Sequence, residues 1–195
     1  MTNFFKRHNK QKTLYGIITI ASVIGFLAAF LQMLEKLALL RNADTNLVCN
    51  INAFFSCSNI LNAWQSSVFG FPNSLMCVSF FAITMTAGLI GWTSGSISKT
   101  MRLIFQGMTI FFVGFGFWYF WQSIFAIGSI CLYCIFCYVG VLAVSYAWLR
   151  LNHKDISINE KSKKLISRMV ASNTDILIWL GIAIIIVAEM IIKFN

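Results

Sequence analysis

Five long apolar runs, separated by polar and basic segments, dominate the sequence. They cover approximately residues 14–34, 75–92, 103–125, 130–148 and 176–192. Each run is close to the ~20 residues that an α-helix needs to cross the ~30 Å hydrocarbon core of a bilayer. The pattern therefore predicts five transmembrane helices, with a long loop over residues 35–71 and a polar loop over residues 150–175.

Composition supports an integral membrane protein. The chain of 195 residues is 58% hydrophobic and only 11% charged, so it has too few polar residues to cover a soluble globule. The first run is longer than the apolar core of a signal peptide, and no convincing cleavage site follows it, which favours a retained helix. We therefore expect one all-α membrane domain that spans residues 1–195 in the lipid bilayer.

The lysines and arginines indicate the orientation. With a cytoplasmic N-terminus, the basic residues on the opposite side are Lys36, Arg41 and Lys193. The cytoplasmic side would then hold Lys6, Arg7, Lys10, Lys12, Lys99, Arg102, Arg150, Lys154, Lys161, Lys163, Lys164 and Arg168. The positive-inside rule thus predicts an outer loop at residues 35–71 and an outer C-terminus. Because the net charge of +9 comes from short stretches beside apolar runs, it does not indicate nucleic-acid binding.

Four of the six cysteines are expected at the outer membrane surface, where disulfides can persist. Cys49 and Cys57 fall in the outer loop, Cys131 at the outer end of the fourth helix, and Cys134 one turn deeper. The CxxC spacing places Cys131 and Cys134 on one helical face, close enough for a disulfide or a dithiol. A thiol at a helix N-terminus faces free backbone N–H groups, which favour its reactive thiolate.

The remaining cysteines and the histidines do not complete a metal site. Cys77 and Cys137 lie deeper in the predicted helices, where a single cysteine usually packs as a small apolar residue. His8 and His153 both fall on the cytoplasmic side by the predicted topology. Since a metal or iron–sulfur centre needs three or four converging ligands, we predict no metal.

Two polar residues lie at the depth of the CxxC pair. Tyr138 follows Cys134 by four residues and so shares its helical face, and Asn73 begins the second helix in FPNSLMC. An amide and a phenol at that depth suit the two carbonyls of an apolar quinone. The same residues also suit a helix cap after Pro72 and an interfacial aromatic anchor.

The loop pair in CNINAFFSC, then VFGFPNSL, then CLYC followed by Tyr138, resembles the vitamin K epoxide reductase family and its bacterial homologues. The resemblance covers roughly residues 14 to 150. It implies a four-helix bundle around a quinone, with the outer loop and a short surface helix over the site. The fifth helix is similar to that of the bacterial members, in many of which a thioredoxin-like domain follows.

The resemblance also implies roles for the site residues. Cys49 would exchange with a partner, Cys57 would relay to Cys131, and Cys134 would lie next to the quinone. Asn73 and Tyr138 would contact the quinone.

The function implied is a thiol:quinone oxidoreductase of the inner membrane. It would reoxidise a separate periplasmic thioredoxin-like partner of the DsbA type and reduce ubiquinone or menaquinone. A quinone-epoxide reductase and a non-catalytic scaffold with static disulfides are the alternatives.

Two positions do not fit a simple assignment. Ala63 occupies a position where the family usually has serine or threonine, so either Asn62, Ser66 or Ser67 substitutes for that hydroxyl or its assistance is weaker in this protein. Glu189 lies inside the fifth run, and its nearness to the C-terminus favours a place at the outer interface.

Overall fold

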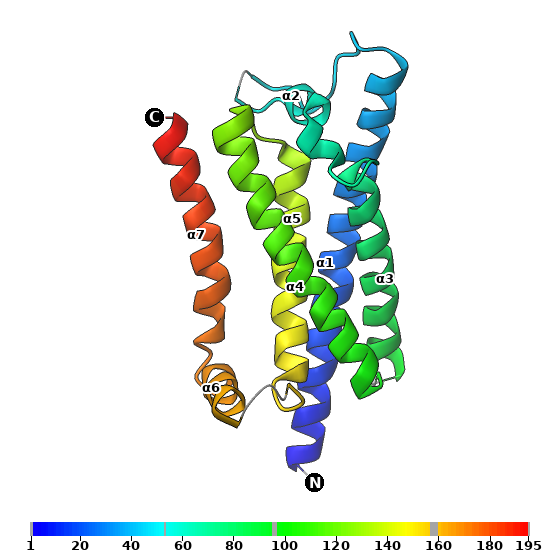
Figure 1. Ribbon diagram of the computed structural model, residues 1–195. Helices are drawn as coiled ribbons and strands as arrows, with labels where there is room; N and C mark the ends of the chain where they lie inside the picture. The colour runs from blue at the N-terminus through cyan, green and yellow to red at the C-terminus, as the bar shows by residue number, and fades with distance from the viewer. Residues whose placement is uncertain (1, 53, 95–96, 157–159, 195) are drawn as a thin grey trace.

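The computed structural model describes residues 2–52, 54–94, 97–156 and 160–194 and confirms an all-α membrane protein. The fold is 81% helical, and the described residues form no strand. In chain order the elements are α1 (Thr2–Arg41), α2 (Cys57–Asn62), the 3-10 turn η1 (Trp64–Ser67), α3 (Asn73–Ser94), α4 (Lys99–Trp121), the π-helical segment η2 (Gln122–Ile127), α5 (Leu132–Asn152), α6 (Glu160–Ala171) and α7 (Asp175–Phe194). Figure 1 shows the long helices side by side.

Among the described residues, five helices are long and apolar enough to cross a membrane: α1, α3, α4, α5 and α7. In Figure 1, the N-terminus and α6 lie at one end of the bundle, whereas α2 and the C-terminus lie at the other. The loop that contains Cys49 and the short helix α2 therefore cover one end of the bundle.

The first helix extends further than its apolar run. The sequence predicts an end near Leu34, but α1 continues to Arg41. The segment EKLALLR consists of residues with good helix propensity and contains no glycine or proline, so nothing stops the helix there. Glu35 and Lys36 consequently belong to a rigid helix at the covered end of the bundle, and not to the loop.

The centre of the bundle is formed by α1 between α3 and α5. Ser22 of α1 and Thr84 of α3 form a buried hydrogen bond of 2.9 Å between their hydroxyls. On the other side of α1, the rings of Tyr15 and Trp148 pack edge to face with centroids 6.1 Å apart. The fifth helix, α7, packs more loosely against α4, α5 and η2.

A buried ion pair fastens α7 to the bundle. Arg150 near the end of α5 donates from Nε and Nη2 to the two carboxylate oxygens of Asp175, at 2.7 and 2.6 Å. The side chains of this pair are only 8% and 1% exposed. Because Asp175 is the first residue of α7, the pair sets where that helix begins.

Removing one member of this pair should destabilise the protein strongly. We expect Asp175→Ala to lower the free energy of unfolding by about 3 kcal/mol, because it leaves the Arg150 charge buried and unpaired. Thermal unfolding in detergent, followed by circular dichroism, measures the effect. Lys99→Ala is the control: Lys99 lies 4.0 Å from Asp155 and is 60% exposed, so we expect a loss below about 1 kcal/mol. Equal stability of the two variants would show that the Arg150–Asp175 ion pair does not stabilise the protein.

Candidate active site

The outer loop is fixed against the start of α5 by backbone contacts. The N–H of Ile130 donates to the carbonyl of Phe54 at 2.9 Å, and Phe55 forms a short parallel bridge with Ile130. Gly128, with a φ of 71°, turns the chain between η2 and α5. These contacts bring together two helix N-termini that are 74 residues apart in sequence, those that carry Cys57 and Cys131.

Each of these two helices carries its cysteine at its N-terminal end. Cys57 is the first residue of α2, whose N-cap Ser56 accepts a hydrogen bond from the N–H of Asn59 at 3.4 Å. Cys131 is the N-cap residue of α5. Both sulfurs are therefore held in rigid positions, away from solvent.

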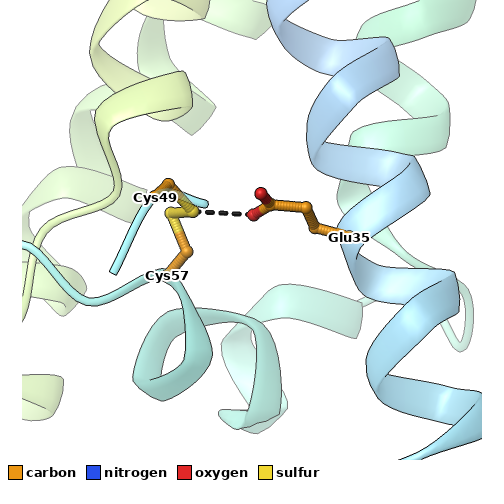
Figure 2. Close-up of side chains that lie close together, drawn as sticks. All are labelled: Glu35, Cys49 and Cys57. Carbon is orange, nitrogen blue, oxygen red and sulfur yellow. Dashed lines mark hydrogen bonds between the residues drawn. A yellow bond between two sulfur atoms is a disulfide. The ribbon is translucent and has the colours of Figure 1, made fainter. Parts of the chain in front are cut away.

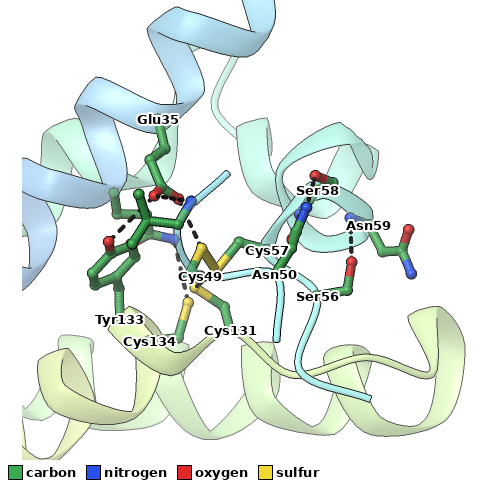
Figure 3. The surroundings of a disulfide bond; sticks show 12 residues. Glu35, Cys49, Asn50, Ser56, Cys57, Ser58, Asn59, Cys131, Tyr133 and Cys134 are labelled. Carbon is green, nitrogen blue, oxygen red and sulfur yellow. Dashed lines mark hydrogen bonds between the residues drawn. A yellow bond between two sulfur atoms is a disulfide. The ribbon is translucent and has the colours of Figure 1, made fainter. Parts of the chain in front are cut away.

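The four predicted redox cysteines lie together. Cys49 and Cys57 form a disulfide, and Figure 2 shows it beside the carboxylate of Glu35. The Sγ atoms of Cys57 and Cys131 lie only 3.2 Å apart, and Cys134 lies on the next turn of α5 (Figure 3). Cys131 and Cys134 are free thiols. The loop pair is thus oxidised, the CxxC pair is reduced, and the two pairs are within exchange distance.

The surroundings of Cys131 favour its thiolate. Hydrogen bonds from the Cys134 thiol and from the backbone N–H groups of Cys134 and Tyr133 hold the pKa of Cys131 below its ordinary value, although burial raises it. A thiolate with a lowered pKa is also a good leaving group. Cys131 is therefore suited to both sides of a thiol–disulfide exchange with Cys57.

A mostly apolar cavity lies on the inner side of Cys134, between α1, α3, α4 and α5. Its lining residues are Gln32, Lys36, Leu61, Ser66, Pro72, Asn73, Ser74, Cys77, Phe112, Phe115, Gly116, Tyr119, Phe120, Cys134, Cys137, Tyr138 and Val141. The side-chain amide of Gln32 donates to Sγ of Cys134 at 3.3 Å. Cys134 consequently connects the cluster of sulfurs to the cavity.

Asn73 and Tyr138 both line this cavity. The amide nitrogen of Asn73 donates to the carbonyl of Gln65 at 2.6 Å, while its Oδ1 is buried with no partner among the described residues. The hydroxyl of Tyr138 donates to the carbonyl of Val113 at 3.1 Å. A ligand in the cavity could therefore donate to the unpaired oxygen of Asn73 and to the hydroxyl oxygen of Tyr138.

Comparison with known families agrees with this arrangement. The model of the Vitamin K epoxide reductase family matches residues 16–149. The chain belongs to this family. Members of the vitamin K epoxide reductase family are oxidoreductases that use quinone-type substrates. The matched residues contain the four cysteines that are predicted to be redox-active and the cavity, whereas α6 and α7 lie beyond them. A search among curated proteins gave no significant match.

Three polar residues of α1 take part in the site and were not predicted from the sequence. Gln32 contacts Cys134, Glu35 contacts Cys49, and the buried Lys36 donates to the carbonyl of Leu61. Their spacing of three and four residues places them on one helical face. That spacing is the signal the sequence offers. The sequence does not reveal it as a helical face, because the apolar run ends at Leu34, which places Glu35 and Lys36 in the predicted loop.

In this member of the vitamin K epoxide reductase family, Ala63 lies at the end of the short helix α2, near the cavity-lining Leu61 and Ser66. Ala63 caps the end of α2. Of the three candidates for its missing hydroxyl, Ser66 is buried, lines the cavity and donates to the carbonyl of Leu61 at 2.7 Å. Ser67 does not line the cavity, and Asn62 is exposed. Of the three, Ser66 is therefore the one that lies at the cavity.

The other candidates have different surroundings. The thiol of Cys137 points to the carbonyl of Gly25 at 3.7 Å and packs in the bundle, and Cys77 is partly buried. Glu35, Cys49 and Cys57 have the atom types of a metal site, but with the sulfurs joined in a disulfide only the carboxylate remains to bind a cation. Glu189 is half-buried on α7, and one of its oxygens has no partner among the described residues.

Proposed function

We propose that this protein is a membrane thiol:quinone oxidoreductase that reoxidises a separate thioredoxin-like partner of the DsbA type. The observation that carries the proposal is the path of sulfur atoms from the Cys49–Cys57 disulfide to Cys131, 3.2 Å away, and on to Cys134 at the cavity. Static disulfides would not require a free thiol pair beside a disulfide. The path also supports an exchange enzyme over a non-catalytic scaffold.

Electrons move along this path in pairs. A thiolate of the reduced partner attacks Cys49 and releases Cys57, and the second partner thiol then displaces Cys49 and leaves the partner oxidised. Cys57 attacks the Cys131–Cys134 disulfide at Cys131 and releases Cys134 as thiolate. Cys49 then displaces Cys131 from Cys57, which restores the loop disulfide and leaves Cys131 and Cys134 reduced.

The quinone accepts these electrons in the cavity. Ubiquinone and menaquinone each present a flat ring with two carbonyls, which suits apolar walls with a few polar groups. The Cys131–Cys134 dithiol gives up two electrons and two protons, so that the quinone leaves as quinol and the CxxC disulfide re-forms. We assign Lys36 as the donor to a ring oxygen of the quinone, and Oδ1 of Asn73 and the hydroxyl oxygen of Tyr138 as acceptors for the hydroxyls of the quinol.

The partner is assigned to the outer loop. Val48 next to Cys49 is 88% exposed and Ile51 is 63% exposed, so these two side chains offer a partner apolar contacts around Cys49. Cys49 itself is buried, so the loop has to shift when the partner docks. We assign this end of the molecule to the periplasmic side of the inner membrane and the N-terminus to the cytoplasm, because disulfides persist in the periplasm and the basic residues favour the cytoplasm.

Complementation tests this function directly. A bacterial strain that lacks its own disulfide-generating quinone oxidase should regain periplasmic disulfide formation when it expresses this protein together with a DsbA-type partner. Restoration should fail without the partner. If the pair restores nothing while the protein is present in the membrane, the proposed role in disulfide formation is wrong, and reduction of a quinone epoxide becomes the reaction to assay.

The proposed quinone site can be tested by adding one methyl group to the wall of the cavity. A Cβ on Gly116 would lie 2.4 Å from the ring of Tyr138, so Gly116→Ala has to displace that ring in the cavity. We expect the KM for a short-chain quinone to rise about tenfold, since overpacking costs on the order of 1–3 kcal/mol. Gly114→Ala is the matched control, because a Cβ there meets no atom within 4 Å. Equal KM values for both variants would place the quinone elsewhere.

A further inference from the structure

The carboxylate of Glu35 contacts the sulfur of Cys49 and is held there by two further hydrogen bonds. Its Oε2 lies 2.7 Å from Sγ of Cys49 (Figure 2). Its Oε1 accepts hydrogen bonds from the N–H of Val48 at 3.1 Å and from the hydroxyl of Tyr133 at 3.3 Å. The carboxylate is thus fixed between α1, the outer loop and α5, with one oxygen directed at a sulfur that reacts.

The two ends of the loop disulfide face different chemical groups. At one end, the Cys131 sulfur lies 3.2 Å from Cys57, and at the other end the Glu35 oxygen lies 2.7 Å from Cys49. A disulfide sulfur carries no hydrogen, so a proton between Glu35 and Cys49 belongs to the carboxyl group in the oxidised state. Once Cys49 is reduced, its thiol can donate to the carboxylate. The contact is therefore suited to proton transfer in either redox state.

The position of Glu35 is not explained by an ion pair with a neighbouring cation. Among the described residues, no lysine or arginine forms an ion pair with it. The neighbouring Lys36 points to the carbonyl of Leu61. The titratable groups that face Glu35 are Cys49 of the loop, together with Tyr133 and Cys131 at the start of α5. Its immediate surroundings are thus those of a group engaged with thiols.

We propose that Glu35 is the catalytic acid–base residue for Cys49. In the forward direction Cys57 and Cys131 form a mixed disulfide, and Cys49 is a thiol. Glu35 takes the proton of Cys49 as its sulfur attacks Cys57, the Cys57–Cys131 bond breaks, and Cys131 leaves as thiolate. Cys49 is oxidised and Cys131 is reduced, so no external oxidant is required. In the reverse direction the Glu35 carboxyl protonates Cys49 as it leaves.

This proposal rests on the proposed function, and one experiment separates the two. Fully reduced protein in lipid nanodiscs is mixed with excess short-chain quinone. The first quinol comes from Cys131 and Cys134 alone. The second requires Cys57 to reduce the new disulfide and Cys49 to resolve the mixed disulfide, so only this second phase depends on Glu35.

Glu35→Gln keeps the shape of the side chain but cannot accept the proton. We expect an unchanged first phase and a second phase about 100-fold slower near pH 6.5, the usual scale for loss of an acid–base group. The Cys57–Cys131 mixed disulfide should accumulate, as detected by acid quenching, alkylation and mass spectrometry. The slow rate should rise about tenfold per pH unit as bulk base replaces Glu35, whereas the wild-type rate should vary less.

Asp44→Asn provides the matched control, since it removes an exposed carboxylate from the same loop and should behave as wild type in both phases. A wild-type second phase in Glu35→Gln would overturn the proposal. Equal slowing of both phases would also overturn it, because a damaged fold or cavity affects both. If wild-type protein forms no quinol at all, the proposed function fails and the role of Glu35 fails with it.

Discussion

Cys134→Ala is expected to abolish quinone reduction. This thiol is the one redox cysteine that lines the cavity, and its removal leaves Cys131 without the partner that closes the CxxC disulfide. We expect turnover with a dithiol donor to fall by at least about 100-fold, on the scale seen when a nucleophile is removed from a catalytic set. The loss of quinone absorbance, followed spectrophotometrically, measures the rate.

Cys137→Ala is the comparison on the same helix. Cys137 also borders the cavity, but its buried thiol points to the carbonyl of Gly25 at 3.7 Å. We expect a change of no more than several-fold, from altered packing alone. Full activity of Cys134→Ala, or an equal loss in Cys137→Ala, would show that electrons reach the quinone by another thiol.

Cys57→Ala is expected to trap the partner on Cys49. The partner is supplied as a DsbA-type variant that keeps only its attacking cysteine, joined in a mixed disulfide to a small thiol. Cys49 attacks this disulfide, the small thiol leaves, and without Cys57 no thiol of the loop pair can release the adduct. We expect most of the protein to become cross-linked. A non-reducing gel followed by mass spectrometry measures the yield and identifies the linked residues.

Cys49→Ala is the control for trapping. It retains Cys57, which is fully buried beneath the loop and should form little adduct. A mixed disulfide through Cys57, or none in Cys57→Ala, would contradict the order of exchange. Either outcome would also remove the reason for assigning Glu35 as an acid–base residue for Cys49.

The helices and the helical face shared by Cys131 and Cys134 could be predicted because each depends on local sequence. Apolar run length determines which segments span a bilayer, and the CxxC spacing determines which thiols share a helical face. The capping of α2 by Ser56 is likewise a local signal, and the structure contains it.

The contacts between distant segments could not be predicted in the same way. The 3.2 Å approach of Cys57 to Cys131 depends on the pairing of Phe54 and Phe55 with Ile130, which no local pattern indicates. The end of α1 was placed too early because hydropathy falls at Glu35 although helix propensity does not. Because of that early boundary, the sequence does not predict the polar face of α1 that contacts both Cys49 and Cys134.

The polar groups of the cavity show a further limit. Sequence spacing placed Tyr138 on the face of Cys134, and the structure puts both residues on the cavity. Spacing could not show that the Tyr138 hydroxyl already donates to Val113, or that Asn73 keeps an unpaired buried oxygen. Such details follow from the packing of α4 and α3, which the sequence of α5 does not specify.

We propose that two electrons pass from a thioredoxin-like partner through these four cysteines to a quinone. The most direct test of this transfer is stoichiometry: purified protein in lipid is mixed with a reduced DsbA-type partner and limiting quinone under argon. We expect one partner disulfide for each quinol formed, and neither product when Cys49 is replaced by alanine. Partner oxidation without quinol, or quinol formation that does not require Cys49, would contradict it.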